Sequence, residues 1–313
     1  MGRWFRGQVA ARDADVRALT DADVDAALAI CATDPVASVL AASRVRVAAS
    51  AGLERSGGHG LLYPASERPR ALCWVGANVV PVLGALEGSD AEAALDAFAA
   101  ALRRQGRTAS SIVGPAAHAL GLLERLEGAW GPVREVRAAQ PSLMITRPSD
   151  VVPDPEVRLA SPDELAALLP ASVAMFLEEV GYSPLGGSPT AYVERVRRLA
   201  QEGRTFVRTA PGPGASLSVS GAAHEGLPLR EHVVFKAELG AVAGEVAQVQ
   251  GVWVTPARRG EGIAAPAMAA VVAGALARFP VVSLYVNSYN ERALATYRRV
   301  GFEQVGTFAT VLF

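Results

Sequence analysis

The stretch that decides the fold runs Gly251-Val252-Trp253-Val254-Thr255-Pro256-Ala257-Arg258-Arg259-Gly260-Glu261-Gly262-Ile263-Ala264. An apolar strand leads into Pro256, and a glycine turn then opens a helix of small residues. Gly260 and Gly262 permit backbone conformations that other residues avoid, and they place no side chain between the main chain and a ligand. The first N–H groups of such a helix lack intrahelical partners and attract anions, and Arg259 adds a positive charge beside them. The pattern therefore predicts a strand–turn–helix unit that binds phosphate groups.

Two common phosphate-binding motifs do not fit this stretch. No Gly-Lys-Ser/Thr follows the turn, and the residue three positions after Gly262 is Ala265, so the GxGxxG spacing is not met. A second informative segment lies downstream, where a strand over 283–286 leads into Asn290-Glu291-Arg292-Ala293-Leu294-Ala295-Thr296-Tyr297-Arg298-Arg299-Val300-Gly301-Phe302. Ala293 and Tyr297 are spaced to share one face of a helix, and Gly301 is placed to end it.

Together the two segments resemble the signatures of the GNAT superfamily of N-acyltransferases. Residues 259–264 match its pyrophosphate loop, Arg/Gln-x-x-Gly-x-Gly/Ala, and residues 290–302 match its Asn-x-x-Ala-x-x-x-Tyr-x-x-x-Gly-Phe segment. The resemblance covers roughly residues 151–313. It implies an acyl-CoA-dependent N-acyltransferase that moves acetyl from acetyl-CoA to a primary amine of a small molecule, peptide or protein by direct attack, without a metal. The alternative is a regulatory module that binds acyl-CoA and catalyses weakly.

The resemblance also implies where the cofactor binds. The strands over 245–254 and 281–286 splay apart at one end, and the pantetheine arm of CoA enters between them. A backbone N–H near Val252 polarises the thioester carbonyl, and the phenol of Tyr297 protonates the departing thiolate. Asn290 either bonds to the cofactor or only caps the helix that starts beside it. The predicted cofactor-binding residues are Val252, Trp253, Val254, Arg259, Gly260, Glu261, Gly262, Ile263, Ala264, Asn290 and Tyr297.

The general base is where the sequence departs from a common family pattern. Many members carry a glutamate four residues before the first cofactor-contacting residue, and Gln248 occupies that position here. Strand alternation puts Gln248, Gln250, Val252 and Val254 on one face. Glutamine cannot take a proton, but it can hold a water that relays one to a carboxylate. The candidates for that carboxylate are Glu178 and Glu179, unless this pair is only a solvated helix end. The predicted catalytic residues are Tyr297, Gln248, Glu178 and Glu179.

The organisation of the chain indicates two related halves. A proline-rich stretch around residues 148–156 reads as a linker between an N-terminal domain, 1–147, and a catalytic domain, 157–313. Both halves end in strand–helix–strand–helix–strand order, which indicates a divergent duplication. The expected fold class is α/β (α+β), with two GNAT-like halves that are each a mixed, mainly antiparallel twisted sheet flanked by helices. The turn over 86–90 lacks arginine and carries Glu87 and Asp90, which would repel a pyrophosphate. We therefore predict that the N-terminal half is non-catalytic.

Residue patterns place most of the elements. Helices are predicted over 20–50 with a break at Asp34-Pro35, and over 90–105, 115–130, 161–176, 189–201, 264–279 and 291–300. Strands are predicted over 70–86 with a turn at 76–78, and over 110–114, 133–145, 205–209, 232–238, 245–254, 281–286 and 307–313.

Composition limits the class of protein. The 313 residues are 50% hydrophobic and 19% charged, which provides a sizeable core, and the formal net charge of −1 argues against a nucleic-acid partner. The mean hydropathy of +0.23 reflects alanine, and no apolar run reaches the roughly 20 residues of a membrane-spanning helix. Cys31 and Cys73 belong to no CxxC or Cys/His cluster, so no disulfide or zinc site is expected. With no signal-peptide pattern in residues 1–12, the expected compartment is the cytoplasm.

Composition does not indicate an oligomeric state.

Overall fold

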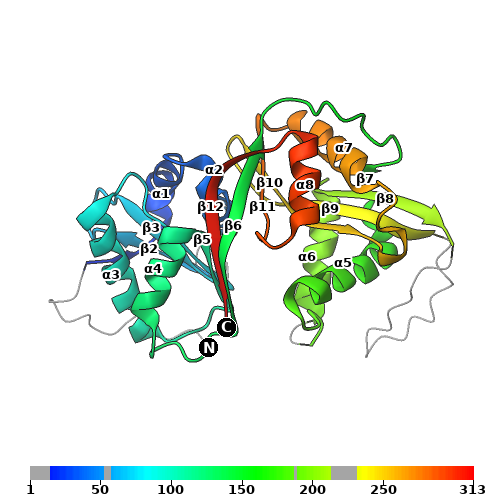
Figure 1. The fold of residues 1–313 in the computed structure, drawn as a ribbon. Helices are drawn as coiled ribbons and strands as arrows, with labels where there is room; N and C mark the ends of the chain where they lie inside the picture. Colours follow the sequence, from blue (N-terminus) through cyan, green and yellow to red (C-terminus); the bar gives the residue numbers. More distant parts are fainter. Residues whose placement is uncertain (1–14, 53–57, 187–188, 213–230) are drawn as a thin grey trace. The chain divides into compact units, whose positions relative to one another are not determined.

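A computed structural model describes residues 15–52, 58–186, 189–212 and 231–313 (Figure 1). The chain divides into two compact units. Unit 1 comprises residues 1–142 and 306–313, and unit 2 comprises residues 143–305.

The sheet of unit 1 contains one parallel pair at its centre. Its strand order is β1-β2-β3-β4-β5-β12, and β4 runs parallel to β5 while the other neighbouring strands are antiparallel. The strands are β1 (Arg17–Ala18), β2 (His59–Tyr63), β3 (Ala71–Val75), β4 (Asn78–Val82), β5 (Ser111–Pro115) and β12 (Glu303–Leu312). A further strand, β6 (Glu135–Ile145), begins in unit 1 and ends in unit 2.

The described residues of unit 1 form four α-helices that pack on this sheet. They are α1 (Val24–Cys31), α2 (Pro35–Ala51), α3 (Gly88–Gln105) and α4 (Ala116–Leu126). The predicted break at Asp34-Pro35 is confirmed, because the Asp34 carboxylate accepts a hydrogen bond from Ala37 N at 3.0 Å and Pro35 starts α2. Side chains such as Cys73, Phe98 and Leu122 form a buried core between the sheet and α3 and α4.

Unit 2 repeats the same plan. Its strands follow the order β11-β10-β9-β8-β7, with β10 and β11 parallel and the rest antiparallel. Helices α7 and α8 share a core with one face of the sheet, and α5 and α6 share a second core with the other face (Figure 1). The strands are β7 (Arg158–Leu159), β8 (Thr205–Pro211), β9 (Glu231–Ala243), β10 (Val246–Val254) and β11 (Val281–Tyr285), and the helices are α5 (Leu165–Val180), α6 (Pro189–Gln201), α7 (Ala264–Leu276) and α8 (Glu291–Val300).

The last strand of the chain belongs mostly to unit 1. The sequence places the strand over 307–313 in the C-terminal domain, 157–313, but Phe308–Leu312 of β12 pair antiparallel with Ser111–Pro115 of β5, and Ala309 and Val311 lie in the core of unit 1. Leu143 and Ile145, at the end of β6, lie in the core of unit 2. Both halves end in the same element order, so the sequence alone does not decide which sheet the last strand joins.

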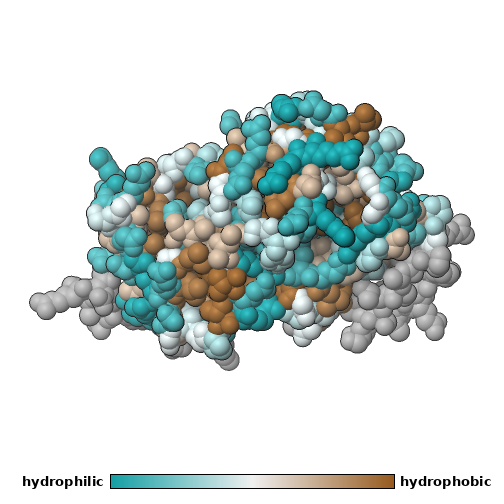
Figure 2. All heavy atoms as spheres, viewed as in Figure 1, coloured by the Kyte–Doolittle hydropathy of each residue, from teal (hydrophilic) through white to brown (hydrophobic). Residues whose placement is uncertain are grey.

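The architecture confirms the predicted fold class, two α/β halves with mainly antiparallel sheets flanked by helices. The structure adds short strands that residue patterns did not reveal, β1, β2 and β7. Figure 2 shows hydrophilic side chains over much of the face in view, with hydrophobic ones gathered in smaller patches. Among the described helices, none combines the length and the apolar character needed to span a membrane. Cys31 and Cys73 are buried free thiols, and burial raises the pKa of both.

Candidate active site

The glycine turn before α7 has the backbone that an anion site requires. Gly260 and Gly262 have φ of +88° and +78°, and nothing lies within 4 Å of a Cβ built at either position. They are therefore required for backbone conformation and not for close packing. Ile263 precedes α7 without making a side-chain cap, so no side-chain cap satisfies the first N–H groups of this helix. This arrangement fits a pyrophosphate, for which the turn and the uncapped helix would supply N–H donors.

Beside this turn, β10 and β11 pair over a short stretch only. Their parallel register runs from Val246↔Val281 to Gln248↔Ser283, although β10 continues to Val254. The described parts of the two strands thus separate after Gln248. This is the splay expected for the pantetheine arm.

A bulge in β10 corrects one prediction. Gln250 pairs with Glu238 and Trp253 with Lys236, so two residues of β10 oppose one of β9, and Gly251 has φ of +58°. The bulge changes the phase of the alternation. Gln248 and Gln250 therefore do not share a face with Val252 and Val254, as simple alternation predicted.

Core packing identifies the two faces of β10. Ala247, Val249, Val252 and Val254 pack on the α7 side, whereas Trp253 belongs to the α5 and α6 side. The Gln250 amide donates to Gln248 Oε1 at 2.9 Å, so these two side chains meet. Gln248 is buried. The position where the resemblance leads one to expect a glutamate therefore holds an amide that is hydrogen-bonded to a second amide.

Glu178, near the end of α5, contacts two of the predicted cofactor residues. Its Oε2 lies 2.6 Å from Arg259 Nη2, and its Oε1 accepts a hydrogen bond from Trp253 Nε1 at 3.1 Å. Arg259 Nε also donates to Val254 O at 3.0 Å. The carboxylate thus holds Arg259 beside the end of β10. Arg258 is paired separately, with Glu261 at 2.6 Å.

Tyr297 and Glu179 are electrostatically linked. Tyr297 is buried on α8, and its ring packs edge-to-face with Phe302 at a centroid distance of 5.9 Å. Burial raises the pKa of Tyr297, and the Glu179 carboxylate raises it further. Glu179 also contributes to the raised pKa of Tyr192 on α6, behind burial and Glu238. Of the two candidate carboxylates, Glu178 is therefore committed to Arg259, while Glu179 is close enough to both tyrosines to act on them.

Asn290 performs the structural role that the sequence left open. Its Oδ1 accepts a hydrogen bond from Ala293 N at 3.1 Å and caps α8. The side-chain amide group is not required for this cap, so capping leaves it as a donor toward the cofactor.

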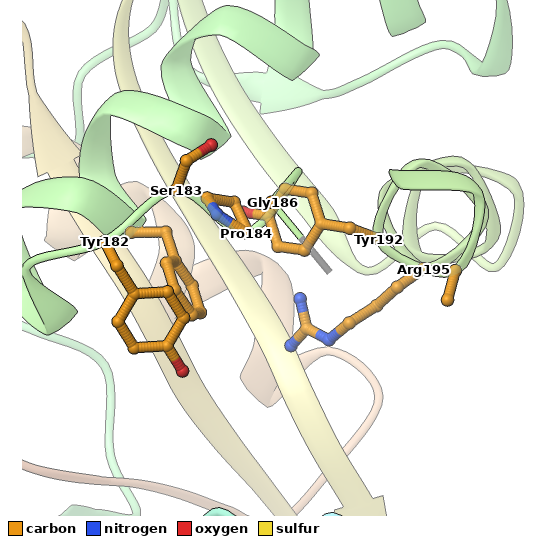
Figure 3. A pocket seen from close by; sticks show the side chains of 8 residues that line it. Tyr182, Ser183, Pro184, Gly186, Tyr192 and Arg195 are labelled. Carbon is orange, nitrogen blue, oxygen red and sulfur yellow. The ribbon is translucent and has the colours of Figure 1, made fainter. Parts of the chain in front are cut away.

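A pocket of about 570 Å³ opens where α5 ends and α6 begins. Its wall is largely aromatic and apolar, with Phe176 in edge-to-face contact with Tyr182 and Tyr192. Figure 3 shows Tyr182 and Pro184 from the segment after α5, and Tyr192 and Arg195 from α6, with the Arg195 side chain extending toward the side where Tyr182 lies. The Tyr192 hydroxyl donates to Ser172 O at 2.9 Å, which fixes the ring. Such a pocket suits the apolar part of a small acceptor.

Three charged residues next to this pocket were missed by the sequence reasoning. Lys236 and Glu238 on β9 are buried and lie 2.7 Å apart, and Arg195 Nη1 lies 3.2 Å from Glu238 Oε2. Burial would raise the pKa of Glu238, but Lys236 and Arg195 outweigh it and hold this pKa below its ordinary value. The available signal was a lysine and a glutamate two positions apart in the apolar strand Val233-Val234-Phe235-Lys236-Ala237-Glu238-Leu239, where alternation puts both on one face.

The corresponding turn of unit 1 differs in charge and in shape. Helix α3 starts at Gly88 with Glu87 as the preceding residue and Asp90 in its first turn. In the strand pair that flanks this helix, the parallel register of β4 and β5 ends at Val79↔Ile112, and a Cβ at Gly114 of β5 would lie 3.7 Å from Pro81 O of β4. Unit 1 therefore offers acidic residues where unit 2 offers Arg259. No group of His, Cys, Asp or Glu within the described ranges could hold a metal ion.

Comparison with known families agrees with this geometry. Residues 225–302 match the acetyltransferase (GNAT) family, and residues 60–168 match a domain of unknown function, DUF4081. A search of curated proteins found no similar sequence.

Solved structures that share the fold extend over both halves. A protein from Drosophila has a TM-score of 0.59 at 11% identity, with 96% of this chain and 98% of that chain covered. A tandem GNAT protein from the clavulanic acid biosynthesis pathway has a TM-score of 0.53 at 12% identity, covering 95% and 97%. A GCN5-related N-acetyltransferase from Sphaerobacter thermophilus has a TM-score of 0.51 at 16% identity, covering 95% and 94%. At these identities the likeness establishes the fold.

The C-terminal half carries an acetyltransferase domain, and the chain as a whole has the two-half fold of a tandem GNAT protein. The family match is thus confined to residues 225–302, while the likeness to solved GNAT structures extends over the fold of both halves.

Proposed function

We propose that this protein transfers the acetyl group of acetyl-CoA to a primary amine, at a site formed by unit 2. The observation that carries the proposal is the uncapped start of α7 behind two positive-φ glycines, next to the point where β10 and β11 separate. In this assignment, the N–H groups of residues 260–264 and Arg259 bind the pyrophosphate, and residues 252–254 line the pantetheine arm.

The chemistry assigns one role to each remaining residue. The amine nitrogen attacks the thioester carbon, a C–N bond forms, and the C–S bond breaks. The N–H of Val252 stabilises the oxygen on which negative charge develops. Tyr297, which burial keeps protonated, gives its proton to the departing thiolate. Glu179 accepts the proton that the amine loses, through a water held by Gln248.

The acceptor in this proposal is a small amine with an apolar or aromatic group. The pocket bounded by Phe176, Tyr182 and Tyr192 is the support, because its wall is largely apolar. Glu179 influences both Tyr192, in this pocket, and Tyr297, on the cofactor side. In this proposal Glu179 receives the proton from an amine held between these two tyrosines.

A matched pair of glycine variants tests the cofactor site. Gly262 and Gly88 both have positive φ, of +78° and +53°, before or at the start of a helix, so Gly→Glu strains both backbones alike and adds the same charge. Calorimetric titration should give one CoA site per chain, abolished by Gly262→Glu and unchanged by Gly88→Glu. Two sites per chain, or binding that survives Gly262→Glu, would contradict the assignment.

Turnover is tested with acetyl-CoA and a panel of primary amines that includes aromatic ones, by following thiol release and confirming the acetylated product by mass spectrometry. Binding of acetyl-CoA without thiol release for any amine would favour the acyl-CoA-binding regulatory module instead.

A further inference from the structure

Lys236 is a buried cation that the proposed acyl transfer leaves without a role. Its side chain is 0% exposed, and its Nζ lies 2.7 Å from Glu238 Oε1. Removing two charges from water carries a desolvation cost that their mutual attraction offsets only when the geometry is good. The pair lies on β9 beside the β10 bulge. The contacts of the ammonium group should therefore explain why a lysine is buried there.

The ammonium contacts the bulge itself. Lys236 Nζ lies 3.4 Å from the carbonyl oxygen of Gly251, which is long for a hydrogen bond but close for attraction between an ion and a carbonyl dipole. A Cβ at Gly251 would lie 3.1 Å from the Met175 methyl group and 3.3 Å from Lys236 Nζ. The glycine therefore adopts φ of +58° and also leaves space for the lysine.

This carbonyl shares a peptide group with the N–H of Val252. The Gly251–Val252 peptide is trans, so its C=O and N–H point in opposite directions. A cation that holds the C=O on the α5 side turns the N–H of Val252 away from that side. Val252 has no register partner on β9 or β11, so the bulge takes its N–H out of the regular strand ladder.

We propose that Lys236 is a positioning residue: it holds the Gly251 carbonyl so that the N–H of Val252 faces the thioester carbonyl of bound acetyl-CoA. The inference rests on the proposed function. Glycine permits the peptide on its C-terminal side to rotate, and rotation would place a carbonyl oxygen where a donor is needed. Lys236 opposes that rotation, and its charge polarises the peptide so that the N–H becomes a stronger donor.

The charged neighbours of Lys236 support this orientation. Glu238 lies on the same strand and face, and Arg195 reaches it from α6 at 3.2 Å. The carboxylate thus contacts two cations, and its carboxyl carbon would lie 3.7 Å from a Cβ at Gly251, so the whole charged group lies beside the bulge. An ion pair with only a structural role would not require a glycine at position 251. A cation that positions this peptide group, by contrast, must reach the Gly251 carbonyl.

Infrared difference spectroscopy of bound acetyl-CoA, labelled with ¹³C at the thioester carbonyl, tests the inference without an acceptor. A donor at the carbonyl oxygen lowers its stretching frequency. The wild-type protein should lower this frequency, and Lys236→Met should return it toward the value in water while the Kd for acetyl-CoA stays within about threefold, because no contact to the CoA moiety is lost.

The matched control is Glu238→Gln, which breaks the same ion pair but leaves the lysine at the Gly251 carbonyl. It should keep most of the frequency shift, whereas a merely structural pair would make the two variants alike. With an amine that is acetylated, Lys236→Met should lower kcat by at least about tenfold, toward the 10²–10³ lost when an oxyanion donor is removed.

The outcomes separate the inference from the proposed function. If acetyl-CoA does not bind to the wild-type protein, both are overturned. If it binds and Lys236→Met keeps the shift, only the role of Lys236 is overturned. If it binds and the wild type produces no shift, the roles of Lys236 and of the Val252 N–H are both overturned, while the cofactor site stands. Should Lys236→Met fail to fold, the double variant Lys236→Met/Glu238→Gln, which leaves no unpaired buried carboxylate, takes its place with the same expected loss of shift.

Discussion

Glu178 on α5 and Arg259 in the glycine turn form an ion pair with 2.6 Å between carboxylate oxygen and guanidinium nitrogen. Both side chains are partly exposed, at 41% and 44%. Exposed ion pairs of this kind contribute only about 0.2–1 kcal/mol to the stability of a protein. In the proposed site the pyrophosphate would compete with Glu178 for the same guanidinium. The pair therefore keeps Arg259 oriented beside Val254 without binding it so strongly that CoA cannot use it.

The first prediction concerns this competition. Glu178→Gln should tighten CoA binding by up to about fivefold, the equivalent of the exposed pair it removes. The amide can still accept the Trp253 hydrogen bond, so the fold around it is kept. Binding is measured by calorimetry for CoA and for pantetheine, and pantetheine, which has no pyrophosphate, should be unaffected. Weaker CoA binding in Glu178→Gln would indicate that the carboxylate assists the cofactor.

Arg259→Glu should have the opposite and larger effect. A charge-assisted contact contributes about 1.5–3 kcal/mol, and charge reversal adds repulsion from the pyrophosphate and from Glu178. We expect CoA affinity to fall by at least about tenfold to a hundredfold, while pantetheine affinity falls little. The matched control is Arg258→Glu, because Arg258 is next to Arg259 in the sequence but is paired with Glu261. This variant should lose less affinity for CoA. Equal losses for CoA and pantetheine would show that Arg259 acts on folding.

The sequence was informative where local rules decide the structure. Gly260 and Gly262 were predicted to need unusual backbone angles, and both have positive φ. The helix over 291–300 was predicted at its observed bounds, because the Asn290 cap and Gly301 stop it at both ends. Signals of this kind depend on a few neighbouring residues, so one sequence is enough to recognise them.

The features that could not be predicted depend on contacts between residues that are far apart in the sequence. The alternation assigned to Gln248, Gln250, Val252 and Val254 ignored the possibility of a bulge, which requires knowing that Lys236 of β9 lies opposite Trp253. The same register brings Lys236 to the Gly251 carbonyl, so that contact could not be inferred either. Glu178 and Glu179 are adjacent in the sequence, and only the packing of α5 distinguishes the one that contacts Arg259.

The pairing of β12 with β5 predicts which part of the protein a mutation in β12 destabilises. Val311 is fully buried in the core of unit 1, so Val311→Asp buries an unpaired charge and should destabilise that core by several kcal/mol. Hydrogen exchange should show lost protection in β5, the antiparallel partner of β12, with β10 unchanged. Val305→Asp is the control on the same strand, because Val305 is 46% exposed, and it should alter neither. Loss of protection confined to β10 and β11 would place β12 with unit 2 instead.

The last prediction tests Tyr297 as the acid. Tyr297→Phe keeps the ring that packs on Phe302 and removes only the hydroxyl, so CoA affinity should be nearly unchanged. A positioned acid contributes about 10²–10⁴ in rate, and turnover should fall by at least about a hundredfold. If product release limits the steady state, the loss is measured in a single turnover. An unchanged single-turnover rate would reduce Tyr297 to a packing residue.

The direction of its pKa shift adds a second test of the same role. Burial first, and then Glu179, raise the pKa of Tyr297 above its ordinary value near 10. The phenol must be protonated to donate, so a raised pKa extends the donor form to higher pH, and Tyr297 should cause no loss of activity below about pH 10. Glu179→Gln removes a nearby negative charge and should lower this pKa, which ultraviolet titration of the phenol measures by difference against Tyr297→Phe. Because Glu179 is also the proposed proton acceptor, Glu179→Gln should lower turnover at neutral pH, where the phenol is protonated in either protein. A variant that moves the tyrosine titration but leaves the neutral-pH rate intact would keep Glu179 as an electrostatic neighbour of Tyr297 and exclude it as the base.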